Sequence, residues 1–125
     1  MAFFASCKKT KDCKLDLSAY NSMKGIVTAD SNKVVSYFGT YENDAPKDFK
    51  DLVEYFMTQD GMTREQAWEA ALCGVRDYPE YYSKEANNYV NTYFGLIDAF
   101  EQSKKSRDAA YKTANDDYEN CKTGR

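Results

Sequence analysis

The chain has 125 residues, of which 42% are hydrophobic and 15% aromatic, and this composition argues against an intrinsically disordered protein. The net charge of -3 argues against a nucleic-acid partner, because binding to phosphates needs a basic surface. No apolar run approaches the roughly 18 residues that a membrane-spanning helix requires, so no transmembrane segment is expected.

The first residues contain a short motif that bears on localisation. Phe4-Ala5-Ser6-Cys7 resembles the end of a bacterial lipoprotein cleavage site, at which Cys7 would carry a lipid anchor. The basic residues and the apolar stretch of a full secretory signal do not precede this motif. The alternative is an ordinary irregular start to the chain.

Apolar residues recur at helical spacing from Leu15 onward, which predicts a first helix. The polar run at residues 29–32 is expected to break it, with Asp30 or Ser31 capping a second, short helix. This second helix would bury Val34, Val35 and Phe38, with Tyr37 and Tyr41 toward its edge.

The clearest helical pattern follows Asp44, which is predicted as an N-cap with Pro46 in the first turn. The spacing i, i+3, i+4, i+7 predicts that this helix buries Phe49, Leu52, Val53 and Phe56. Asp60-Gly61 should end it, and Thr63 with Gln66 forms a capping box for the next helix. The buried face of that next helix would consist of Ala67, Trp68, Ala71, Leu72 and Val75.

After Tyr78-Pro79-Glu80, no proline interrupts the chain between Tyr82 and Cys121, so a long C-terminal helix is predicted. Its apolar stripe contains Ala86, Val90, Tyr93, Ile97, Phe100, Tyr111, Ala114, Tyr118 and Cys121, and is interrupted by Lys104 and Arg107. A break near Ser103–Ser106 stays open at this point.

Strand patterns are nearly absent, and the predicted fold class is therefore all-α: an irregular bundle of four to five helices with a long C-terminal helix. Residues 1–14 are predicted to form an irregular N-terminal arm that contains two cysteines. Residues 15–125 are predicted to form a single helical-bundle domain.

The four cysteines are compatible with disulfides and with a secreted, periplasmic or surface-held protein, or with a cytoplasmic one if the thiols are reduced. An unbroken C-terminal helix is about 60 Å long. It would keep Cys73 and Cys121 beyond the roughly 7 Å that a disulfide allows between Cα atoms.

Three pairings remain, and the first is a bond between Cys7 and Cys13. In the second, one of these two pairs with Cys121 and Cys73 stays a buried thiol. In the third, a broken helix returns Cys121 to Cys73. We favour the second, which makes Cys7, Cys13 and Cys121 the disulfide candidates.

Catalytic chemistry has little support, because the chain has no histidine to serve as a general base or a zinc ligand. Nucleotide-binding glycine motifs are also absent. The carboxylate clusters, at Glu65 and Glu69 and at Asp116, Asp117 and Glu119, are interpreted as exposed helix charge. We therefore expect neither an enzyme, nor a metal site, nor a cofactor.

The eleven tyrosines are the most distinctive feature of the composition. Their ordinary role is packing at the edge of a core, where the ring is buried and the hydroxyl stays hydrated. The functional interpretation is an aromatic patch for a protein partner, because tyrosine and arginine dominate interface hot spots. The candidate partner-binding residues are Arg76, Tyr78, Tyr81 and Tyr82.

These features predict a non-enzymatic protein-binding domain, exported or surface-held, that occludes a partner protein as an inhibitor, immunity protein or effector does. The alternative is a helical carrier that encloses a small apolar or lipid ligand. Its candidate lining is Phe49, Phe56, Trp68, Phe94 and Phe100.

Overall fold

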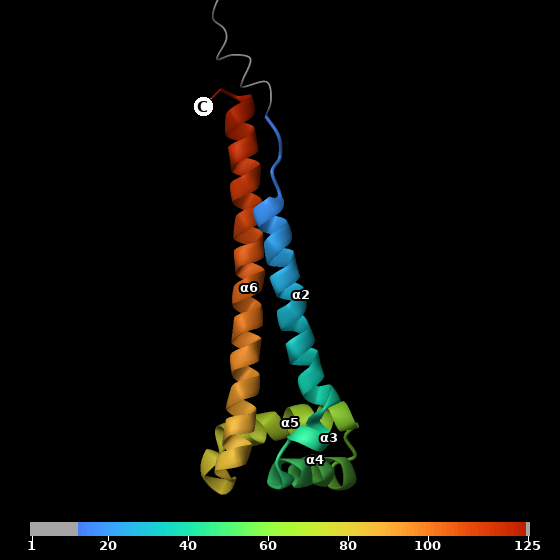
Figure 1. The fold of residues 1–125 in the computed structure, drawn as a ribbon. Coiled ribbons are helices and arrows are strands. Elements are labelled where there is room, and N and C mark those ends of the chain that lie inside the picture. Colours follow the sequence, from blue (N-terminus) through green and yellow to red (C-terminus); the bar gives the residue numbers. More distant parts are fainter. Residues whose placement is uncertain (1–12, 125) are drawn as a thin grey trace, which may run out of the picture. The chain divides into compact units, whose positions relative to one another are not determined.

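The computed structural model describes residues 13–124, and within them it confirms the all-α class, with helices and no strand (Figure 1). The predicted long C-terminal helix is also confirmed. The helices are α2 (Ser18–Gly39), α3 (Tyr41–Asp44), α4 (Lys47–Gln59), α5 (Arg64–Asp77) and α6 (Lys84–Lys122), with a turn of 3-10 helix, η1 (Pro79–Tyr81), between the last two.

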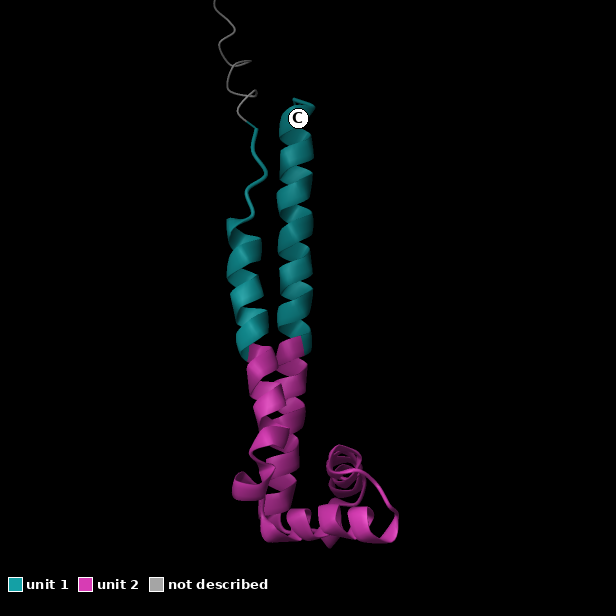
Figure 2. Cartoon of the chain, turned by 90° about the vertical axis from the view of Figure 1, so that its right-hand side faces the viewer, with its two compact units in different colours: residues 1–29, 101–125 teal, residues 30–100 magenta. Residues whose placement is uncertain are grey.

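The chain divides into two compact units, which Figure 2 shows in different colours. Unit 1 comprises residues 1–29 and 101–125, and unit 2 comprises residues 30–100. Among the described residues, every buried apolar side chain belongs to unit 2: Tyr41, Ala45, Phe49, Val53, Ala67, Trp68, Ala71, Leu72, Val75, Ala86, Tyr89 and Val90. We call this set the core of unit 2.

Helix α2 corrects two predictions. The expected break at residues 29–32 does not occur, because no proline is present and each polar residue costs a helix only tenths of a kcal/mol, roughly, relative to alanine. Val35 is 68% exposed rather than buried. Val34 and Phe38 are half-buried, and Phe38 packs against the core of unit 2. Tyr41, which begins α3, lies in that core rather than at its edge.

Helix α4 begins later than predicted. Asp44 closes the short helix α3 and is not an N-cap; α4 starts at Lys47, after Pro46 in an extended conformation. The predicted buried face is confirmed, since Phe49 and Val53 are fully buried and Leu52 and Phe56 pack against the core. α4 ends at Gln59 as expected, and the φ of +68° two residues later explains a glycine at position 61.

Helix α5 packs against α4, and its start matches the sequence prediction. Thr63 Oγ1 accepts from the backbone N–H of Gln66 at 3.2 Å, and Gln66 Oε1 accepts from the backbone N–H of Thr63 at 3.1 Å. This is the predicted capping box. All five apolar residues predicted for the inward face of α5 are buried.

The start of α6 depends on a carboxylate from another helix. Asp48, in the first turn of α4, accepts from the backbone N–H of Ser83 at 2.8 Å and from its hydroxyl at 3.0 Å. The Ser83 hydroxyl in turn accepts from the backbone N–H of Ala86 at 3.0 Å, which caps α6. In an ordinary capping box, a glutamate of the same helix accepts the backbone N–H of the N-cap residue. Here Asp48, from a different helix, accepts that N–H bond from Ser83.

Replacing Asp48 by alanine is expected to lower the free energy of unfolding by about 1–3 kcal/mol, because it removes charge-assisted hydrogen bonds at a half-buried site. Urea denaturation of the variant measures this loss. Asp51→Ala on the same helix is the matched control, since Asp51 is exposed and forms an ion pair with exposed Lys47. Equal losses in both variants would show that the Asp48 contacts to Ser83 do not stabilise the fold.

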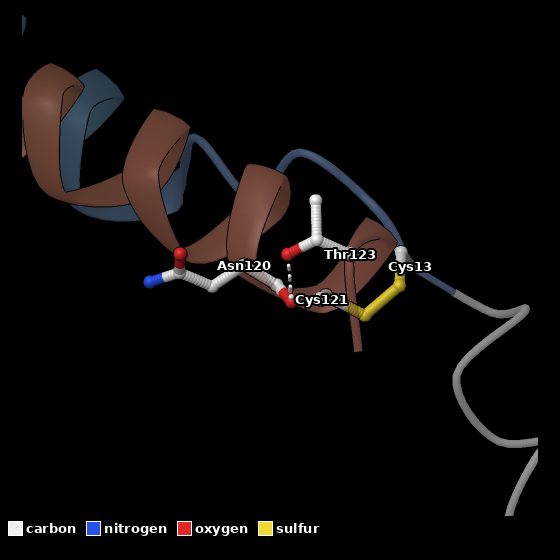
Figure 3. The surroundings of a disulfide bond; sticks show 4 residues. All are labelled: Cys13, Asn120, Cys121 and Thr123. Carbon is white, nitrogen blue, oxygen red and sulfur yellow. Dashed lines mark hydrogen bonds between the residues drawn. A yellow bond between two sulfur atoms is a disulfide. The ribbon is translucent and has the colours of Figure 1, made fainter. Parts of the chain in front are cut away.

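Unit 1 contains the disulfide. Cys13 is bonded to Cys121, with their Cα atoms 5.8 Å apart (Figure 3). Just beyond, the hydroxyl of Thr123 donates to the backbone carbonyl of Asn120 at 3.1 Å, at the end of α6. The favoured pairing of an arm cysteine with Cys121 is confirmed, and Cys7 with its lipid-anchor hypothesis lies outside the described residues.

The structure also tests the alternative pairing of Cys121 with Cys73 and the predicted burial of Cys73. Helix α6 continues without a break through residues 103–106, so the third pairing is excluded. Cys73 is a free thiol as expected, but it is exposed rather than buried. It lies on α5 outside the inward stripe of Ala71, Leu72 and Val75, which explains why a cysteine inside an apolar run still reaches the surface.

Candidate functional site

The candidate partner-binding residues all lie in unit 2, where α5 ends and η1 follows. α5 closes with the backbone N–H of Tyr78 donating to the carbonyl of Gly74 at 3.0 Å. Pro79 cannot donate such a bond, and it starts the 3-10 turn instead. The backbone N–H of Tyr81 then donates to the carbonyl of Tyr78 at 3.1 Å, which brings positions 78 and 81 to the same side of one turn.

Tyr78 and Tyr81 form an exposed aromatic pair. Their side chains are 57% and 75% exposed, and their ring centroids lie 6.2 Å apart at an interplanar angle of 38°. This spacing is within the range of interacting aromatic rings. We call these two residues the tyrosine pair.

The other two candidates have different surroundings. Tyr82 is half-buried and packs against the core, with its hydroxyl close to Gly74 of α5. The guanidinium of Arg76 lies 4.9 Å from the ring centroid of Phe94, and its Nε lies 3.4 Å from a carboxylate oxygen of Asp77. Tyr82 therefore has mainly a packing role, whereas Arg76 is a partly exposed charge that is already stacked on a ring.

Asn87 holds the turn that carries the tyrosine pair, a role that was not predicted from the sequence. From the first turns of α6, its side-chain amide donates to the carbonyls of Pro79 and Ser83, each at 3.0 Å. The backbone of η1 is thereby fixed to the start of α6. An asparagine in a helix gave no signal of this role, because the bond to residue 79 depends on the turn between them.

Apart from Tyr55, which is 54% exposed, the remaining tyrosines of unit 2 follow the packing interpretation. Trp68 donates to the hydroxyl of Tyr89 at 3.4 Å, and the hydroxyl of Tyr37 donates to the backbone carbonyl of Tyr89 at 2.9 Å. Burial raises the pKa of Tyr89 to about 12, because the surrounding core disfavours the charged phenolate. Tyr93 completes the cluster with its ring centroid 4.9 Å from that of Trp68.

Most of the aromatic rings that would line a ligand cavity in the carrier alternative are packed in or against this core. Phe49 is fully buried with its ring centroid 4.9 Å from that of Tyr89, and Trp68 is 3% exposed. Phe56 and Phe94 pack against the same core. The carrier function stays a prediction, and mass analysis of an organic-solvent extract of the purified protein tests it.

Residues 13–124 contain no group of three cysteine, aspartate or glutamate side chains placed to hold a metal ion. None of the helices formed by these residues combines the length and apolar character needed to cross a membrane. The acidic clusters of α5 and α6 are exposed, in agreement with their interpretation as helix charge.

Comparison with known proteins adds no functional assignment: no family model, no curated protein and no solved structure matches the chain. The class supported by the fold is therefore an all-helical protein, and the function is argued from its surface alone.

Proposed function

We propose that the chain is a non-enzymatic protein-binding domain that occludes a site on a partner protein through the tyrosine pair. The observation that supports this function is the exposure of two adjacent tyrosine rings, Tyr78 and Tyr81, on a turn held at both ends. Buried rings such as Tyr89 stabilise the fold, whereas these two leave most of their surface in water.

The turn is also suited to binding because it is already ordered. The capping bond of α5, the backbone bonds of η1 and the amide of Asn87 fix it in the unbound protein. A surface ordered in advance loses less conformational entropy when it binds. The surrounding charges, Arg76, Asp77, Glu80 and Lys84, would form the polar rim that typically encloses an aromatic hot spot.

The disulfide supports an exported or surface-held protein, because disulfides persist mainly in oxidising compartments. An inhibitor, immunity protein or effector that works outside the cytoplasm fits this setting. In each case the mechanism is steric: the rigid helical surface covers the partner's site, and no bond is made or broken.

A photo-crosslinking amino acid in place of Tyr81 identifies the partner in extracts of the native source. The same residue in place of Tyr55 is the matched control, since Tyr55 is 54% exposed on α4. We expect one protein to be captured from position 81, to be lost with Tyr78→Ala, and to be absent from position 55. Capture that is equal from both positions would contradict the proposed surface.

The affinity of the captured partner gives the quantitative prediction. Replacing both Tyr78 and Tyr81 by alanine should weaken binding by about 10–100-fold, as expected for truncation of two hot-spot rings. The melting temperature should stay within about 3 °C of the wild type, since exposed substitutions change stability little. A large loss of melting temperature would instead assign both rings to the core.

A further inference from the structure

Unit 1 lacks the apolar core that stabilises unit 2. In its described residues, 13–29 and 101–124, no apolar side chain is buried, and the buried residue is a serine, Ser103. Three large side chains are well exposed instead: Leu15 at 40%, Ile26 at 47% and Tyr111 at 47%. Hydrophobic burial therefore contributes far less to holding unit 1 together than to holding unit 2.

The two helical segments of unit 1, residues 18–29 of α2 and 101–122 of α6, lie side by side (Figure 2). Tyr20 and Tyr111 meet edge-to-face across them, with ring centroids 5.4 Å apart. The ion pairs Lys104–Glu101, Lys112–Asp116 and Lys122–Glu119 each run along the same helix and do not join the two segments.

The surface between the segments is hollowed, and its lining combines small side chains with the charged Lys14, Asp16 and Asp117. A groove of about 530 Å³ lies there, and Ala19, Ala109, Ala110 and Ala114 are among its lining residues. Small side chains leave little contact area for dispersion and apolar burial across a pair of helices.

The Cys13–Cys121 disulfide links the two segments of unit 1 covalently. Cys13 precedes α2 by a few residues and Cys121 lies in the last turn of α6, so the bond closes the end of unit 1 across a sequence separation of 108 residues. Such a bond keeps the two segments at high effective concentration even when their side-chain contacts open.

We propose that the Cys13–Cys121 disulfide is a redox-sensitive clasp: its two-electron reduction opens unit 1 locally, while unit 2 stays folded on its own core. A dithiol reductant supplies the two electrons and two protons. The sulfur–sulfur bond breaks, Cys13 and Cys121 become thiols, and the dithiol is oxidised to a cyclic disulfide.

Hydrogen–deuterium exchange of the whole protein, with and without dithiothreitol, tests this proposal. Amides of residues 18–29 and 101–122 should exchange at least about tenfold faster after reduction, because local opening then exposes them. Amides of the core helices α4 and α5 should change by less than about twofold, since the core of unit 2 does not depend on the bond. Reoxidation should restore the original pattern.

Two variants complete the test. Cys121→Ser should reproduce the reduced pattern without any reductant, and Cys73→Ser, which removes an exposed free thiol, should behave as the oxidised wild type. Unchanged protection of unit 1 after reduction would overturn the proposal. Loss of protection in both units together would overturn it as well, because the disulfide would then support the whole fold.

Discussion

Replacing Phe49 by alanine is expected to lower the free energy of unfolding by about 3–5 kcal/mol, the range observed when a buried aromatic ring is truncated. Phe49 is fully buried in α4, and its ring centroid lies 4.9 Å from that of Tyr89 on α6. The substitution removes apolar contacts with a second helix and leaves a cavity that the surrounding backbone cannot fill completely.

Guanidinium denaturation followed by circular dichroism measures this loss. Tyr55→Ala is the control, because it removes an aromatic ring from the same helix at a position that is 54% exposed. Its effect should stay within about 0.5 kcal/mol. If the two variants lose similar stability, then α4 does not bury Phe49 as the structure shows.

Replacing Trp68 by alanine should have an effect of comparable size, about 3–5 kcal/mol. Trp68 connects α5 with α2 and α6. Its ring centroid lies 5.4 Å from that of Phe38 on α2 and 4.9 Å from that of Tyr93 on α6. Its indole N–H also donates to the hydroxyl of Tyr89 at 3.4 Å. Alanine therefore removes two ring contacts and leaves the Tyr89 hydroxyl without this donor.

Trp68→Phe separates these contributions, since it keeps most of the apolar volume and removes the indole donor. We expect an intermediate loss, detected by circular dichroism because the chain has a single tryptophan and both variants lack its fluorescence. A phenylalanine variant as unstable as the alanine variant would show that the hydrogen bond, rather than packing, dominates at this position.

The structure separates what local sequence patterns predict from what they do not. α4 and α5 were predicted well because the periodicity of Phe49 and Val53, and the capping box at Thr63, depend only on neighbouring residues. The expected break before Val34 was wrong, because a polar run without proline weakens a helix by too little to end it. The prediction of Asp44 as the N-cap of α4 was wrong, because Asp44 is the last residue of the short helix α3.

The candidate site was only partly accessible from the sequence. Tyr78-Pro79-Glu80 marked the boundary between two helices, because proline cannot continue a helix, but the half-buried position of Tyr82 could not be distinguished from the exposed positions of Tyr78 and Tyr81. Asn87 and Asp48 were missed, since their partners come from other elements. The cysteine pairing was predictable in part: an unbroken α6 excludes Cys73 as a partner of Cys121, but the sequence left open both a break in that helix and the choice between Cys7 and Cys13.

The covalent closure of unit 1 is tested most directly by peptide mapping of protein that is made in an oxidising compartment and alkylated under denaturing conditions without reductant. We expect a peptide containing Cys13 to be linked to one containing Cys121, with both sulfurs unmodified, and Cys73 to carry the alkyl group. Full alkylation of both Cys13 and Cys121 would contradict the disulfide. It would also remove the observation that supports an exported or surface-held protein.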